Sequence, residues 1–168
     1  MTLTKGRSTV WMEEVEKMKL AEALILRADY QKQIAQLQHR LNRSALVQEG
    51  EAPPENPQEL ISELETLVTN LTRLIQQINH TNAVTPFQHI TLAAVLAERD
   101  SLQMKRSAYS SLIEAASYRQ ERYMRSELRF VSTVDVADLQ RQIDRLARDH
   151  RQLDTQIQAL NWATDLIE

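Results

Sequence analysis

The sequence predicts an all-α protein, an antiparallel up-down four-helix bundle with long helices and coiled-coil-like seams. Residues 57–79 carry a nearly unbroken apolar heptad, which places one apolar stripe along a helix: Leu60, Leu64, Leu67, Leu71, Leu74 and Ile78. Only two glycines, four prolines and 5% aromatic residues argue against a β-sandwich or an α/β fold. A chain of 168 residues is long enough for one domain with its own core.

The first helix is expected from Met12 or Met18 to Ala45. Residues 1–17 are a poor start for a helix, and we expect them to be an N-terminal extension outside the core. Residues 18–168 then form the single bundle domain. The first helix ends before Gly50 and the paired prolines that follow it, because neither residue type continues a helix.

The second helix is predicted from Pro57 to about Asn79. Asn56 is suited to be its N-cap, Pro57 fits the first helical position, and Glu59 completes a capping box. A polar connection up to Pro86 follows.

The third helix is expected to begin after Thr91, which is suited to cap it, and its pattern weakens beyond Arg119. Residues 130–134 are rich in β-branched side chains and should be extended. Asp135 is then the expected N-cap of a fourth helix that runs past Leu160.

Several short stretches resemble a family of bacterial proteins often labelled septicolysin. They are Met18–Arg27, Gln48–Glu51, Ile78–Asn82, Arg125–Leu128, Val131–Val136 and Asn161–Trp162. The resemblance covers essentially residues 18–168 and implies a helical, cytosolic protein of undefined function. The family label also implies a pore-forming cytolysin, but these helices mix both charge signs and lack the cationic face that membrane disruption requires.

The bundle register predicts a polar layer between the helices. Counted from one shared end, Arg27, Arg99 and Asp154 fall at similar depths, and Asp100 is the other nearby carboxylate. Inward guanidinium groups need partners, because an isolated buried charge is very costly. One interpretation is a layer of salt bridges that fixes the register. The alternative is a pocket in which both arginines bind a small anion.

At the same end of the bundle we expect three asparagine side chains and one tryptophan side chain to lie close together. The residues are Asn79, Asn82, Asn161 and Trp162. The amides are suited to cap helix ends, with Trp162 closing the core, and a polar binding cluster is the other interpretation.

Composition narrows the range of functions. The net charge of −3 gives no reason to expect nucleic acid, and no apolar run approaches the length of a membrane span. Cysteine is absent, which fits a cytoplasmic protein. No Glu-x-x-His pair occurs, so we predict no metal site, and we expect no cofactor.

Two functions remain open, and no catalytic motif decides whether the protein is an enzyme. The first is a structural or protein-interaction module that associates with copies of itself or with another protein. Its basis is a third helix that is expected to outreach the second, leaving the seam around Leu112 without an intrachain partner. The second is a binder of a small anionic ligand, with Arg27 and Arg99 in contact with it.

Overall fold

The structure is a computed structural model that describes residues 17–117 and 131–167. Its elements are α1 (Leu20–Ser44), α2 (Pro57–Val84), β1 (Pro86–Phe87), β2 (Ile90–Thr91), α3 (Leu92–Ser117) and α4 (Val136–Ala163). The predicted all-α fold with four helices is confirmed. Nearly all of the expected extension, residues 1–17, lies outside the described residues, as does the motif Arg125–Leu128.

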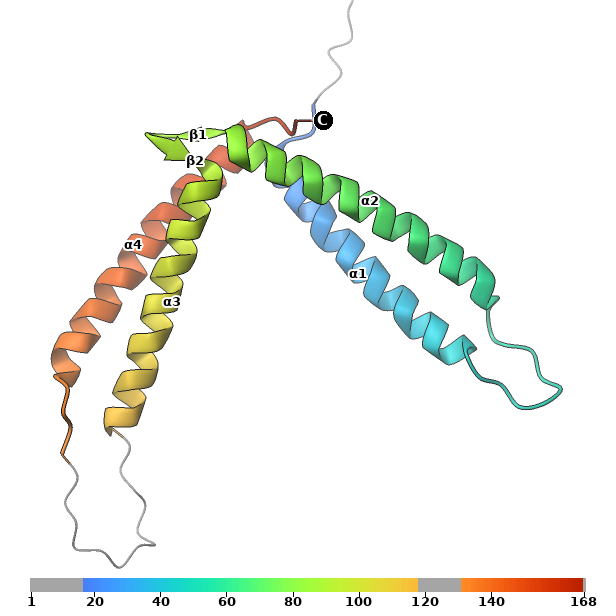
Figure 1. Ribbon diagram of the computed structural model, residues 1–168, viewed down its shortest axis with the longest axis horizontal. Coiled ribbons are helices and arrows are strands. Elements are labelled where there is room, and N and C mark those ends of the chain that lie inside the picture. The colour runs from blue at the N-terminus through green and yellow to red at the C-terminus, as the bar shows by residue number, and fades with distance from the viewer. Residues whose placement is uncertain (1–16, 118–130, 168) are drawn as a thin grey trace, which may run out of the picture.

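The helices pack as two hairpins that diverge from a shared apex (Figure 1). α1 leads away from the apex and α2 returns to it, while α3 leads away again and α4 returns. Within each hairpin the two helices lie side by side, and the hairpins touch through α1 with α4 and α2 with α3. The result is a V whose two arms we call the α1–α2 arm and the α3–α4 arm.

The structure contains the predicted N-caps at Asn56, Thr91 and Asp135, but the capping box expected with Glu59 is not formed, because Glu59 Oε1 accepts from the Asn56 side-chain amide at 3.0 Å instead of the backbone N–H. The Asn56 side chain accepts a hydrogen bond from the Gln58 N–H at 3.0 Å, and Asp135 Oδ1 accepts one from the Asp138 N–H at 2.9 Å. Thr91 Oγ1 accepts from the Ala94 N–H at 3.3 Å. Each bond satisfies an N–H group that the first turn of a helix leaves without a partner.

The end of α2 differs from the prediction, because the helix continues five residues beyond Asn79 to Val84. The extra turn buries Thr81 at the apex, and Pro86 then stops the helix. α2 is therefore 28 residues long. The residues after Ser117 of α3 lie outside the described part of the chain, so the expectation that the third helix outreaches the second by about ten residues stays a prediction.

The main hydrophobic cluster lies at the apex, while Leu37 and Leu60 are buried further out between α1 and α2. The buried members of the apex cluster come from all four helices: Leu20, Ala23, Leu74, Ile78, Leu92, Val95 and Ile157. The two-residue strands β1 and β2 pair as a small antiparallel hairpin between α2 and α3. The apex therefore holds both the main hydrophobic cluster and the connection between the arms.

Candidate functional site

Arg99 and Asp154 lie together on the α3–α4 arm, as the bundle register predicts. Arg99 Nη1 is 3.5 Å from Asp154 Oδ1, and Arg99 Nη2 donates to Asp100 Oδ1 at 2.9 Å. Asp100 follows Arg99 directly on α3, whereas Asp154 reaches it from α4. The arginine side chain is 26% exposed, so this ion-pair group sits at the edge of the helix contact and is partly hydrated.

Arg27 is not joined to this group. It lies on α1 in the other arm, and α1 and α3 do not pack against each other. Within the described residues, no hydrogen bond or ion pair links Arg27 to Arg99, Asp100 or Asp154, and its buried Nε has no acceptor. The predicted layer is thus divided between the arms, because α1 and α3 were assumed to share one continuous bundle.

The predicted cluster of amides and Trp162 is spread around the apex. Asn161 is 4% exposed and Asn82 is half-buried, but Asn79 is exposed. Trp162 is 55% exposed and does not close the core. Thr81, which is fully buried, holds the central polar position instead: its hydroxyl donates to the Gln77 carbonyl at 2.8 Å and accepts from the Ile167 N–H at 3.0 Å.

The segment after α4 is fixed against the start of α1. The Leu20 N–H donates to the Thr164 carbonyl at 2.9 Å, and the Leu166 N–H donates to the Met18 carbonyl at 2.8 Å. Lys19 Nζ also lies 2.5 Å from Asp165 Oδ1. This hydrogen bond from Lys19 lowers the pKa of the Asp165 carboxyl below its ordinary value. We call this pairing of residues 17–20 with residues 164–167 the clasp.

A cavity of about 690 Å³ lies between α1 and α2 beneath the clasp. Its apolar lining includes Leu26, Leu74 and Leu166, and the cations at it are Lys17 and Arg73. This site could not be predicted from the sequence. Its residues come from four separate segments, and neither Lys17 nor Asp165 belongs to a local motif.

A second polar group fixes the far end of the α1–α2 arm. Arg40 of α1 donates to Glu55 from Nη2 at 2.5 Å and from Nε at 3.0 Å, and its Nη1 lies 3.6 Å from Glu63. The bond from Arg40 lowers the pKa of Glu55 below its ordinary value of 4.5. The group ties the loop after α1 back onto its own helix.

Two other features bear on function. Within residues 17–117 and 131–167, no three His, Cys, Asp or Glu side chains are grouped so as to hold a metal ion. Among the helices of those same ranges, none has the length and apolar character needed to cross a membrane.

The comparisons with known proteins give a family and a fold. Residues 27–166 match a profile described as a family of unknown function, DUF6847. A crystal structure of a functionally unknown conserved protein from Corynebacterium diphtheriae is similar, with 44% identity and a TM-score of 0.83. The match covers 90% of this chain and 99% of that one. A search of curated proteins found no match. The unknown function agrees with the sequence analysis, whereas none of these findings supports a septicolysin relationship.

Proposed function

The chain belongs to the DUF6847 family, and we propose that it is a self-associating interaction module whose arms pair with those of a second copy. The observation that carries this proposal is the low burial of apolar side chains along the α3–α4 arm. In the described part of α3 the buried residues are Leu92 and Val95, and in α4 they are Ile157 and Asn161. All four lie within the two turns nearest the apex.

Beyond those turns, the arm still carries an apolar seam. Leu102, Ile113, Ile143 and Leu146 are only half-buried, and Leu112 is 41% exposed. Full burial of such a side chain stabilises a protein by about 1.5–3 kcal/mol, and partial exposure forgoes part of that gain. A two-helix hairpin has no further helix to cover its seam, whereas two hairpins together complete a four-helix arrangement.

A second copy of this chain matches the exposed seam of the α3–α4 arm both in charge and in length. α3 carries three acidic and three basic residues, and α4 carries four of each, so paired arms bring no net repulsion. An arm of the partner also has the same length, about 40 Å at 1.5 Å per residue. The two helix faces of one arm, each of this length and about 10 Å wide, present about 800 Å² per chain. A pair of arms would therefore bury on the order of 1,600 Å² in total, the size of a standard stable interface.

The test is the mass in solution by sedimentation equilibrium. At about 10–100 µM, above the Kd of a weak specific complex, we expect twice the chain mass of 19.4 kDa. Leu112→Asp places a charge in the open seam and should give the monomer. Because Leu112 is already 41% exposed within one chain, this change should cost the monomer's own fold little.

The matched control is Ser107→Asp, which adds the same charge at an exposed position of α3 outside the seam and should remain dimeric. A monomeric wild type over this range, or an equal response of the two variants, would refute pairing with a second copy. A different protein partner is then the remaining form of the interaction hypothesis.

Our proposal includes a cytoplasmic location, with which the absence of cysteine agrees. It assigns no lytic activity to the protein.

A further inference from the structure

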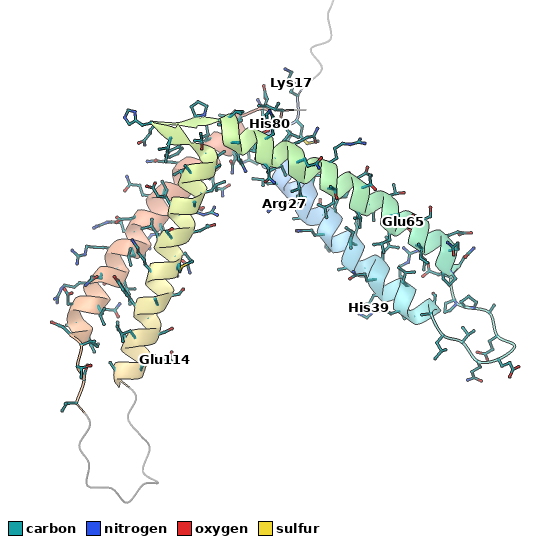
Figure 2. All side chains as sticks on the ribbon, in the orientation of Figure 1. Lys17, Arg27, His39, Glu65, His80 and Glu114 are labelled. Carbon is teal, nitrogen blue, oxygen red and sulfur yellow. The ribbon has the colours of Figure 1, made fainter. Side chains whose placement is uncertain are left out.

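The clasp does more than hold two segments together, because it also forms one wall of the 690 Å³ cavity. Met18 and Leu166 are joined by a backbone hydrogen bond and both line it. The Ile167 N–H is held by Thr81 Oγ1 at 3.0 Å. Figure 2 shows Lys17 at the apex near His80, whereas Arg27 points from α1 toward the inner side of the V. The cavity is therefore separate from the Arg99–Asp154 group.

The two cations at this cavity form no contact pair within the described residues, and Lys17 acts on Asp165 only through its charge, which adds to the effect of Lys19 in lowering the pKa of that carboxyl. Lys17 and Arg73 take part in no hydrogen bond or ion pair among residues 17–117 and 131–167, and both are exposed enough to meet a ligand. The cavity also holds the carboxylate of Asp165, but Lys19 already engages that group at 2.5 Å. The local charge is therefore positive, and an anion is the complementary ligand.

The rest of the lining is suited to an apolar body with one polar end. Leu26 from α1, Leu74 from α2 and Leu166 from the clasp provide aliphatic surface, and Tyr30 adds an aromatic ring with a hydroxyl group. A volume of about 690 Å³ is within the range of ligand pockets, which are mostly apolar with a few polar groups that fix orientation. Carboxylates are recognised by arginine through paired hydrogen bonds.

We propose that this cavity binds a small amphipathic carboxylate, with its charged group at Lys17 and Arg73 and its aliphatic part on Leu26, Leu74 and Leu166. This site does not depend on pairing of the arms. It also differs from the anion pocket predicted from sequence, since neither Arg27 nor Arg99 lines it.

The test is a titration of the full chain with sodium decanoate, followed by calorimetry and by backbone amide shifts. We expect saturable binding at one site, with the largest shifts at Leu26, Leu74 and Leu166. Lys17→Gln combined with Arg73→Gln should weaken binding by about tenfold or more, because the double variant removes both charged donors to the carboxylate. The thermal midpoint of this double variant should stay close to that of wild type, since neither side chain forms a hydrogen bond or contact ion pair among the described residues and Lys17 acts on Asp165 through its charge alone.

Three controls test the specificity of the result. Lys105→Gln with Arg151→Gln removes the same charges from exposed positions on the α3–α4 arm and should leave binding unchanged. Decanamide, which lacks the negative charge, should bind more weakly than decanoate. The Leu112→Asp monomer should bind decanoate as wild type does, which separates this site from the dimer surface.

Three outcomes would overturn the proposal. They are the absence of saturable binding, equal weakening by both pairs of substitutions, and amide shifts confined to the α3–α4 arm. The last would indicate that decanoate coats the open apolar seam.

Discussion

Thr81 and Ile167 are joined by a hydrogen bond across 86 residues of sequence. The Ile167 N–H donates to Thr81 Oγ1 at 3.0 Å, and Thr81 is fully buried. Through this bond the last turns of α2 hold the segment that follows α4. A single hydroxyl thus connects the two arms with the wall of the cavity.

Replacing this hydroxyl is expected to destabilise the apex. Thr81→Val keeps the shape of the side chain but leaves the part-buried Ile167 N–H without its acceptor, which should lower the free energy of unfolding by about 1–3 kcal/mol. Urea denaturation measures the change. Thr69→Val is the matched control, because Thr69 Oγ1 donates only to the Glu65 carbonyl within an exposed turn of α2. An equal effect of both variants would show that the Thr81–Ile167 bond contributes nothing.

Arg27 and Arg99 are expected to respond oppositely to replacement by methionine. Arg27→Met removes a buried Nε that has no acceptor and should raise the free energy of unfolding by about 1 kcal/mol. Arg99→Met leaves Asp100 and Asp154 without their cation and should lower it by up to about 1 kcal/mol, as for a largely hydrated ion pair. Thermal unfolding of both variants is the measurement. A loss of stability in Arg27→Met would show that this side chain has an acceptor in solution.

The stability of the α1–α2 arm should depend on pH through Glu55. Arg40 lowers the pKa of Glu55 in the folded state below its ordinary value of 4.5. The stabilisation is therefore fully present above that value and is lost as the pH falls through the lowered folded-state pKa.

We therefore expect Glu55→Gln to lower the urea midpoint at pH 7, with the difference from wild type shrinking as the pH falls below 4.5. Glu51→Gln, at an exposed position of the same loop, should show no such difference at any pH. If the difference in urea midpoint between Glu55→Gln and wild type stays constant with pH, the role assigned to the Arg40–Glu55 pair is contradicted.

Two isoleucines of α4 test where the core of a single chain lies. Ile157 is fully buried at the apex, so Ile157→Ala should cost about 2–5 kcal/mol. Ile143 is only half-buried, and in the Leu112→Asp background, where arms do not pair, Ile143→Ala should cost clearly less. Urea denaturation of both variants in that background compares the two positions. Equal losses would place a second core in the arm of one chain.

The helices and their starts could be predicted from the sequence because their causes are local. A heptad of apolar residues defines α2, and Asn56, Thr91 and Asp135 bind N–H groups two or three residues away. The contact of Arg99 with Asp154 also followed from counting residues along two paired helices. Within a hairpin, the loop fixes which positions face each other.

The relation between the hairpins could not be predicted in this way. Periodicity shows that a helix has an apolar face, but it does not say whether another helix of the same chain covers that face. Arg27 was therefore placed in a layer that spans both arms, although α1 and α3 do not pack together. The clasp was missed for a similar reason: Lys19 and Asp165 are 146 residues apart, and neither has a local signal.

The buried cluster that joins the two arms lies at the apex, so a rotation of one arm about that cluster produces a displacement that grows along the arm. α4 is 28 residues long, so its outer end lies about 42 Å from the apex at 1.5 Å per residue. A rotation of about 10° at the pivot would displace that end by about 7 Å over this length. The spread of the V is thus controlled by a few side chains around Ile78, Leu92 and Ile157, and small repacking there sets the distance between the two tips.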